Sequence, residues 1–505
     1  MTLAEVAAAV GLPAPPGAGT VTVTSVEFDS RKVTPGALYV ALPGERVDGH
    51  DFADAAAESG AVAMLGSRPA SRLPTLVAGD GDAVLAALSA LAATAVRPLI
   101  DSGLTVVGVT GSAGKTSTKD MIAAVLRRAG TVVAPPESFN NEIGHPYTVL
   151  RADTGTDFLV LELSARGRGH IAALARVAPP RVGAVLNVGS AHLGEFGSRE
   201  AIAVAKGELV EALPPASAGG VAVLNADDPL VAAMASRTPA AVVRTAVHGD
   251  GDVRARDVRL GAGARAEFTL LTPEGSAEVR LRVVGQHQVP NALAAAAVGR
   301  ALGVEVATVA DALSQAGPVS KWRMAVTDLP GGVTLVNDAY NSNPESVRAA
   351  LQALAVLAAG RRTWVVLGEM AELGQAAAQA HADVGRLVAA SAVDRLIVIG
   401  AAARPIHQAA QEGSGTDGST GVAAQWVPDR HAALAAVVSG IRPGDVVLVK
   451  ASRSVGLERL AAALAEAIPA AVADGIPSEP AGEPPAADRA GGASPARGEA
   501  GQERA

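Results

Sequence analysis

The chain has 505 residues, too many for a single hydrophobic core, and this length predicts about three domains. Its 50 acidic and 42 basic residues give a formal charge of -8, which leaves no overall basic field for nucleic acid or an anionic membrane. The absence of cysteine excludes disulfides, thiolate zinc sites and cysteine nucleophiles.

The amino terminus, MTLAEVAAAVGLP, lacks the basic segment and the long apolar core of a signal peptide. The sequence also contains no run of about 18 or more uncharged apolar residues of the kind that spans a bilayer. These two observations predict a cytoplasmic, soluble protein without a membrane span.

Lysine is scarce, since only six of the 42 basic residues are lysines. In a chain that usually carries arginine, a lysine indicates a position that needs a compact ammonium or a primary amine. Lys115 and Lys206 fall inside the motifs described below, and Lys321 lies in SKWRM (320–324), the segment that carries Arg323.

Strand-like and helix-like segments divide the chain into four predicted regions. Residues 1–103 begin with an alternating strand at 21–28 and form a small mixed α/β domain. Residues 104–318 contain apolar strands between Ala-rich helices, as in a parallel sheet covered on both faces, with a β-alternating insertion near 253–284. Residues 319–469 form a further α/β set. Residues 470–505, rich in Ala, Pro, Gly and charge, are predicted to be disordered.

The segment TVVGVTGSAGKTS at 105–117 has the pattern of a strand, a glycine turn and a helix. Amides of such a turn attract phosphate oxygens, the lysine neutralises phosphate charge, and the following hydroxyl can bind Mg²⁺. An ordinary turn is the alternative, because the usual consensus has its first glycine where this chain has Val109. The candidate nucleotide-binding residues here are Thr110, Gly111, Ser112, Ala113, Gly114, Lys115 and Thr116.

Three further polar residues follow predicted strands of the same region. Glu162 ends an apolar strand, where a carboxylate can hold Mg²⁺ or can simply be solvated. His192 follows another strand, and Lys206 lies on a predicted helix. A lone histidine is commonly a packing residue and a helix lysine is commonly solvated, so both alternatives stay open on these residues alone.

Taken together, these motifs resemble the Mur ligase family, ATP-dependent amide-forming enzymes of peptidoglycan precursor assembly. The resemblance spans about residues 23–460 and explains the unusual phosphate loop, because the family uses TGxxGKT. It rests on TGSAGKTS, Glu162, SAHLGEFGS with His192, AKGEL with Lys206, NADDP at 225–229 and GQHQVPNALAAAA.

The resemblance implies an α/β fold of three domains and a disordered tail. Residues 1–103 would be a small mixed α/β domain that binds a UDP-sugar. Residues 104–318 would be a central ATP-binding domain with a P-loop ATPase-like parallel sheet and a β-rich insertion. Residues 319–469 would be a Rossmann-like ligase domain, followed by the tail at 470–505.

It also implies roles for residues that match the family's motifs. Lys115 would bind the β/γ-phosphates, Thr116 and Glu162 would hold one Mg²⁺, and His192 would help to hold a second. Lys206 matches the lysine that the family carbamylates with CO2, which turns an ammonium into an anionic oxygen donor. Lys115, Lys206 and His192 are therefore the expected catalytic residues.

The remaining implied contacts come from other parts of the chain. Asn291 would face the adenine, while Arg323 and Asp338 would reach the phosphates and ribose from the third domain. Ser30 and Arg31 resemble residues near the uridine end of the substrate.

Within the family, the segment at 29–52 resembles members that add the third residue or the terminal dipeptide. VNDAYNSNPESV (336–347), VLGEMAELG (366–374) and KASRSVGLE (450–458) are similar to the dipeptide-adding member, and no DNPR segment is present. The implied reaction joins D-alanyl-D-alanine to UDP-MurNAc-tripeptide through an acyl phosphate and yields UDP-MurNAc-pentapeptide, ADP and phosphate. ATP and Mg²⁺ are the implied cofactors, and a monomer is expected.

Four other functions are compatible with parts of the pattern. A third-residue-adding ligase shares the first two domains' chemistry, and a polyglutamate-type ligase lacks the uridine-domain resemblance. A P-loop ATPase without ligase activity would hydrolyse ATP independently of a UDP-sugar and a dipeptide. A non-enzymatic binding module would make Lys115, Glu162, His192 and Lys206 coincidental. No motif distinguishes a tripeptide that ends in diaminopimelate from one that ends in lysine.

Overall fold

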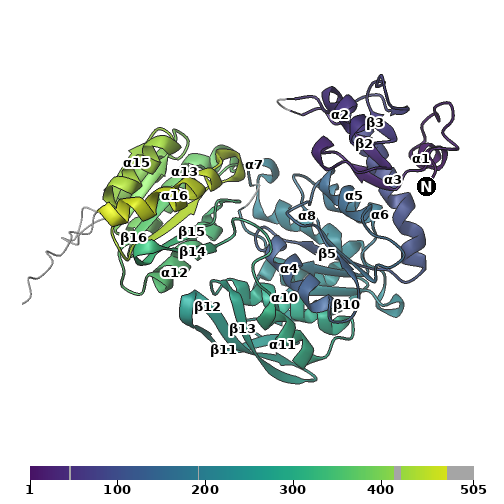
Figure 1. Ribbon diagram of the computed structural model, residues 1–505. Helices are drawn as coiled ribbons and strands as arrows, with labels where there is room; N and C mark the ends of the chain where they lie inside the picture. The colour runs from purple at the N-terminus through teal and green to yellow at the C-terminus, as the bar shows by residue number, and fades with distance from the viewer. Residues whose placement is uncertain (45–46, 191–192, 414–421, 475–505) are drawn as a thin grey trace, which may run out of the picture.

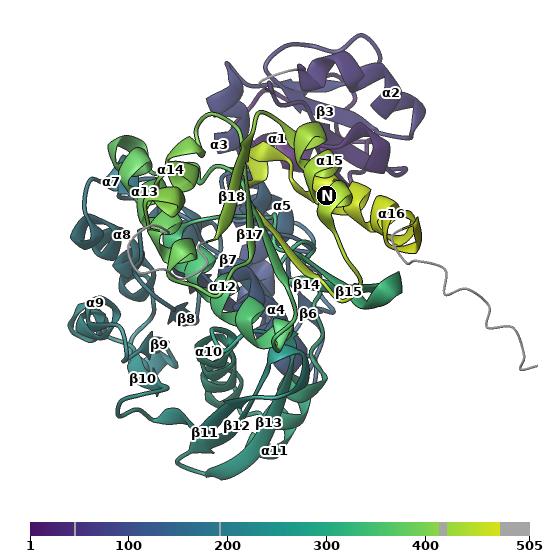
Figure 2. The ribbon, with the colours of Figure 1, turned by 90° about the vertical axis from the view of Figure 1, so that its left-hand side faces the viewer.

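The computed structural model describes residues 1–44, 47–190, 193–413 and 422–474. Within these residues, the strands form three sheets, each in its own domain, and the domains follow one another along the chain. The middle domain lies between the other two (Figure 1), and Figure 2 views the molecule from the side of the third domain. The predicted α/β fold of three domains is confirmed.

The first domain contains a four-stranded parallel sheet. The predicted strand at 21–28 is shorter than expected, because residues 21–23 pair with the amino terminus instead: Leu3 N–H donates to the Val21 carbonyl oxygen over 2.8 Å. The elements are α1 (Leu3–Val10), β1 (Ser25–Glu27), the 3₁₀ turn η1 (Ser30–Lys32), β2 (Ala37–Val40), α2 (Ala53–Glu58), β3 (Ala63–Gly66) and β4 (Thr75–Val77).

Helix α3 (Gly81–Asp101) connects the first two domains. Its first half, including Val84 and Leu88, packs into the core of the first domain, and its second half, including Val96, packs into the core of the middle domain. Of the described helices, α3 alone has the length and apolar composition of a membrane span. Its packing in two cores accounts for that composition, since an apolar stripe is what a connecting core helix must bury.

The middle domain contains a nine-stranded sheet in the order β13-β12-β11-β10-β9-β8-β5-β7-β6. The strands from β11 to β6 run parallel, whereas β12 and β13 are antiparallel. The predicted β insertion is therefore an extension of the main sheet. The strands are β5 (Thr105–Thr110), β6 (Val132–Val133), β7 (Phe158–Glu162), β8 (Val182–Val185), β9 (Val221–Asn225), β10 (Ala241–Ala246), β11 (Val253–Leu260), β12 (Arg265–Thr272) and β13 (Gly275–Val284).

Helices cover both faces of this sheet because its strands are apolar on both sides. Val107 faces a core built with α4, α10 and α11, while Val106 faces a core built with α6 and α8. The alternation follows from the two-residue period of a strand. The helices are α4 (Lys115–Leu126), α5 (Gly144–Val149), α6 (His170–Val177), α7 (Leu193–Phe196), α8 (Arg199–Glu211), α9 (Pro229–Ala232), α10 (Gln288–Ala301) and α11 (Val306–Gln315).

The third domain contains a six-stranded sheet in the order β14-β15-β19-β16-β17-β18, antiparallel only at β14. Asn343 caps α12 by accepting from the Ser346 amide over 2.8 Å, and Pro344 occupies the first turn. The elements are β14 (Ala325–Leu329), β15 (Val333–Asn337), α12 (Pro344–Ala358), β16 (Thr363–Leu367), α13 (Ala377–Ala389), β17 (Arg395–Ile399), α14 (Arg404–Gly413), β18 (Ala423–Val427), α15 (Arg430–Gly440), β19 (Val446–Lys450) and α16 (Glu458–Asp474).

Helix α16 extends past residue 470, where the disordered tail was predicted to begin. The helix continues because Val472 is buried, 2% exposed, in the core of the third domain. It packs so closely on Gly331 that a Cβ at Gly331 would lie 2.3 Å from Cγ1 of Val472. Residues 475–505, the rest of the predicted tail, lie outside the described residues.

Truncation tests this boundary. A chain that ends at Asp474 should unfold at the wild-type temperature, because it keeps the Val472 contact. A chain that ends at Pro469 loses that buried side chain, worth about 2 kcal/mol, and its third domain should unfold roughly 5 °C lower. Differential scanning calorimetry measures both; equal unfolding temperatures would contradict the role of the last helical turn.

Candidate active site

The phosphate loop lies between β5 and α4, as the sequence predicted. Gly114 has a φ of +85°, which glycine adopts without strain. A Cβ there would lie 2.4 Å from Oδ1 of Asn291, so the loop passes close to α10. The Lys115 ammonium folds back and donates to the Gly111 carbonyl oxygen over 2.8 Å. The loop is therefore the tight turn at a helix start that favours a phosphate group.

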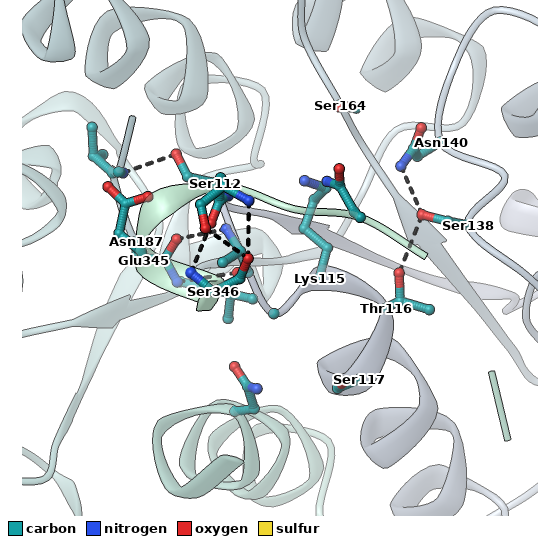
Figure 3. Close-up of a pocket in the computed structure, with 18 of the residues that line it drawn as sticks. Ser112, Lys115, Thr116, Ser117, Ser138, Asn140, Ser164, Asn187, Glu345 and Ser346 are labelled. Carbon is teal, nitrogen blue, oxygen red and sulfur yellow. Dashed lines mark hydrogen bonds between the residues drawn. The ribbon is translucent and has the colours of Figure 1, made fainter. Parts of the chain in front are cut away.

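A second loop, at 187–190, braces the phosphate loop. The side chain of Asn187 accepts from the Ala113 amide over 2.9 Å and donates to the Ala113 carbonyl oxygen over 3.1 Å. The Gly189 amide donates to the Ser112 hydroxyl over 2.9 Å. Figure 3 shows Ser112 and Asn187 side by side at this edge of the site. These bonds fix the conformation of the turn before a ligand enters.

Hydroxyl groups surround the carboxylate of Glu162. Oε2 accepts from the Ser138 hydroxyl over 2.9 Å and from the Thr116 hydroxyl over 3.2 Å. Asn140 donates to Ser138 over 3.0 Å, and the Thr116–Ser138–Asn140 row is visible in Figure 3. Oε1 of Glu162 is buried and has no hydrogen-bond partner among the described residues.

A buried carboxylate oxygen without a partner is costly unless a cation or proton satisfies it. Thr116 and Glu162 therefore fit a divalent cation. No cluster of three or more His, Asp or Glu side chains suited to a metal occurs within the described part of the chain. The hydroxyl of Thr116 and the carboxylate of Glu162 match Mg²⁺, which is usually bound by one or two carboxylates together with water and substrate phosphates.

The third domain reaches into this site through Arg323. Its guanidinium donates to the Thr116 hydroxyl over 2.8 Å and lies over the ring of Tyr340, 4.3 Å from the centroid. Nearby, the buried ammonium of Lys450 pairs with Asp338 over 2.6 Å. The other carboxylate oxygen of Asp338 accepts from the Met324 amide over 3.0 Å. The third domain thus presents a fixed cationic side chain to the phosphate loop.

A cavity of about 950 Å³ lies between the middle domain and the third domain. Its volume lies at the upper end of the range for small-molecule sites. Lys115 and Thr116 line it from the phosphate loop, Asn291 from α10, and Arg323 and Asp338 from the third domain. Ser112, Ala113 and Gly114 line it as well, so predicted residues from segments far apart in the sequence meet around one space.

Lys206 is buried on α8, 3% exposed, and outside the lining of this cavity in the described structure. Its ammonium forms no hydrogen bond or ion pair with any residue that the structure describes. Burial, reinforced by the nearby charge of Lys115, lowers the pKa of Lys206 well below its ordinary value. Burial also lowers the pKa of Lys115, and the carboxylate of Glu162 opposes that shift.

Besides Lys206, the predicted residues Thr110, Gly111 and Glu162 do not line the cavity, although Glu162 accepts from the lining residue Thr116. The predicted substrate residues do not line it either. Ser30 and Arg31 lie in η1 of the first domain, where the Arg31 side chain is 87% exposed and pairs with Asp29 over 2.8 Å. His192, predicted as a catalytic residue and metal ligand, lies outside the described residues.

Sequence analysis missed several residues that build this site. Ser138 and Asn140 lie in PESFNNEIGHP, a polar loop that follows a short strand and was not assigned a function. Lys450 was overlooked although lysine scarcity marks it as clearly as Lys115. Asn187 carried no local signal, because its contacts with Ala113 span 74 positions in sequence.

Gly114→Ala tests the phosphate loop. The new Cβ adds backbone strain and meets Asn291, so we expect the variant to lose the rise in unfolding temperature that MgATP gives the wild type. Gly169→Ala is the matched control, since Gly169 also precedes a helix at a φ of +85° but has open space around it. Each variant should lose about 1–3 kcal/mol of stability from strain alone. A normal response of Gly114→Ala to MgATP in thermal unfolding would contradict the loop assignment.

Family models match most of the chain. The Mur ligase family catalytic domain matches residues 22–96, the Mur ligase middle domain matches residues 109–299, and the Mur ligase glutamate ligase domain matches residues 322–453. The three matches follow the three domains of the structure.

Curated relatives and solved structures agree with this match. The UDP-N-acetylmuramoyl-tripeptide–D-alanyl-D-alanine ligase of Mycobacterium tuberculosis is 52% identical over 472 residues, which cover 87% of this chain and 92% of that protein. The Escherichia coli ligase of the same name is 36% identical and covers 88% of this chain and 94% of that protein.

A crystal structure of MurF from Acinetobacter baumannii superimposes with a TM-score of 0.78 at 31% identity, covering 92% of this chain and 98% of that one. MurF of Thermotoga maritima, solved in complex with ADP, gives a TM-score of 0.73 at 29% identity and covers 88% of this chain and 98% of that one. On these matches and on the phosphate loop that the structure places opposite Arg323, the chain belongs to the Mur ligase family of ATP-dependent ligases.

Proposed function

We propose that this chain joins D-alanyl-D-alanine to UDP-MurNAc-tripeptide at the expense of ATP. The observation that carries the proposal is the single cavity bounded by the phosphate loop and by Arg323 and Asp338 of the third domain. An ATP-dependent ligase needs such a cavity because it must hold two substrates and a nucleotide at one point. The 52% identity to a ligase named for this reaction supports the choice of substrates.

In this proposal, the phosphates of ATP bind the amides of residues 111–116 and the ammonium of Lys115. Asn291 faces the adenine, and Arg323 lies beside the γ-phosphate because it already donates to Thr116. Asp338, held by Lys450 and by the Met324 amide, accepts from the ribose. The positive charge of Lys115 and Arg323 offsets the charge that develops on the transferring phosphoryl group.

Mg²⁺ would be held by the hydroxyl of Thr116 and the free Oε1 of Glu162, with His192 supporting a second ion. When bound, the metal neutralises phosphate charge and orients the transferring group. Ser138 and Asn140 would keep the Glu162 carboxylate in place, because both donate toward its Oε2.

Lys206 is proposed to carry a carbamate formed with CO2. Only a neutral amine attacks CO2, and the lowered pKa of Lys206 supplies that form. The carbamate is anionic, so it would be attracted to the charge of Lys115, which repels the unmodified ammonium. It would also place oxygen donors near the metal. Arginine cannot form this group, which explains a lysine at this buried position.

The reaction proceeds in two steps. A carboxylate oxygen of the tripeptide attacks the γ-phosphorus, the bond to the β-phosphate oxygen breaks, and ADP leaves. The free amine of D-alanyl-D-alanine then attacks the acyl carbon, loses a proton, and expels inorganic phosphate. Because water would hydrolyse the acyl phosphate, the third domain must cover the site during both steps.

The first domain would hold the uridine end through Ser30 and Arg31, which places the nucleotide-sugar away from the phosphate loop and directs its peptide toward it. We further propose a cytoplasmic monomer that does not use α3 as a membrane anchor. The tripeptide can end in diaminopimelate or in lysine.

Lys115→Ala tests the ATP site. Loss of the ammonium should reduce phosphate release in the presence of both substrates by at least about a hundredfold, the scale of a lost transition-state donor. Arg348→Ala, which removes an exposed cation from α12, is the control and should retain turnover. Near-normal ATP consumption by Lys115→Ala would remove the phosphate-loop assignment.

Lys206→Ala tests the carbamate. Activity should fall by about 10–100-fold, and a short-chain carboxylic acid should restore part of it by supplying the missing carboxylate. Lys321→Ala, at an exposed lysine, should gain nothing from the acid. A carbamate signal from carbon-13-labelled bicarbonate in the wild type, absent in Lys206→Ala, provides a second readout. Full activity of Lys206→Ala without the acid would contradict the proposal.

A further inference from the structure

Aromatic residues are rare in this chain, which has six phenylalanines and three tyrosines among 505 residues. Three of them meet where the first domain contacts the middle domain. The ring of Phe28 lies 5.0 Å from that of Tyr147 and 6.2 Å from that of Phe139, and the Phe139 and Tyr147 rings are 5.8 Å apart. All three pairs are edge-to-face, the arrangement in which aromatic rings attract one another. We call these residues the aromatic contact.

One side of the aromatic contact belongs to the proposed UDP-sugar site. Phe28 directly precedes Asp29, Ser30 and Arg31, and Asp29 caps the turn that carries the other two. The Tyr147 hydroxyl donates to the carboxylate of Glu27 over 2.9 Å, between residues 120 positions apart. Burial raises the pKa of Glu27, and burial together with this carboxylate raises the pKa of Tyr147 to about 12. The bond therefore joins a strand of the first domain to a helix of the middle domain.

The other side of the aromatic contact belongs to the proposed metal site. Phe139 stands between Ser138 and Asn140, the residues that donate toward Glu162. Gly144, at the start of the helix that carries Tyr147, packs on Phe139 so closely that a Cβ would lie 2.6 Å from its Cα. The backbone of Phe139, and with it the adjacent donors of Glu162, therefore packs directly against the start of the helix that carries Tyr147.

We propose that the aromatic contact couples the UDP-sugar site to the MgATP site. Phe139 acts as a positioning residue: occupancy of the first domain fixes Phe28, Phe28 fixes the Phe139 ring, and Ser138 and Asn140 then hold Glu162 for the metal. The inference rests on the proposed function, because it requires that the first domain bind the nucleotide-sugar. By linkage, each ligand raises the affinity for the other by the same factor.

Calorimetric titration tests the coupling. The affinity of the protein for a non-hydrolysable ATP analogue with Mg²⁺ is measured with and without saturating UDP-MurNAc-tripeptide, and the ratio is the coupling factor. We expect a factor of about ten in the wild type, within the usual range for coupled sites, and a factor near one in Phe139→Leu. Phe158→Leu removes a partly buried ring at the opposite end of the strand that bears Glu162, and it should keep the wild-type factor.

Tyr147→Phe provides a variant that keeps the packing intact, since it loses only the hydroxyl bonded to Glu27. The coupling factor of Tyr147→Phe should lie between those of the wild type and Phe139→Leu. An unchanged factor in Phe139→Leu, or loss of affinity for one ligand alone with the factor preserved, would overturn the coupling. Binding of both ligands by the wild type without any coupling would overturn it too. Failure of the wild type to bind UDP-MurNAc-tripeptide would instead overturn the proposed function and the coupling with it.

Discussion

The hydrogen bond from Arg323 to Thr116 is the contact on which the site depends, because it joins the third domain to the phosphate loop over 2.8 Å. Two further contacts hold the same arrangement. Ser320 donates to Asp120 on the phosphate-loop helix over 2.7 Å, and the carboxylate of Glu345 accepts from both the amide and the hydroxyl of Ser190. The cavity exists only while these domains face each other, which suits a reaction whose intermediate must be kept from water.

The site contains several buried charged side chains, which differ in whether a partner of opposite charge lies beside them. Lys119 and Lys450 are fully enclosed and pair with Asp120 and Asp338, so their charges are compensated. Oε1 of Glu162 is enclosed without a hydrogen-bond partner among the described residues, and Lys206 is enclosed with its pKa lowered by burial. Buried polar groups without a partner are costly and are common at functional sites, so these two groups are the ones that a bound ligand or ion would satisfy.

Much of the fold could be predicted from the sequence, because the apolar strands and Ala-rich helices of the second and third domains have strong periodicity. The strand at 21–28 was predicted too long, since the alternation VTVTSVEF does not reveal that residues 21–23 pair with the amino terminus. The phosphate loop and Glu162 follow from local pattern. Asn187 and Ser138 do not, because their contacts join segments that only the folded sheet brings together. The end of α16 was missed because the alanine-rich sequence hides Val472, a side chain that is buried beyond residue 470.

The most direct test of the account is identification of the product made with MgATP from each of two substrate pairs. We predict phosphate release and a UDP-MurNAc-pentapeptide from UDP-MurNAc-tripeptide with D-alanyl-D-alanine, and neither from UDP-MurNAc-dipeptide with a diamino acid. Product from the second pair alone would mean that this chain adds the third residue. Phosphate release independent of both pairs would contradict ligase activity and indicate a simple ATPase.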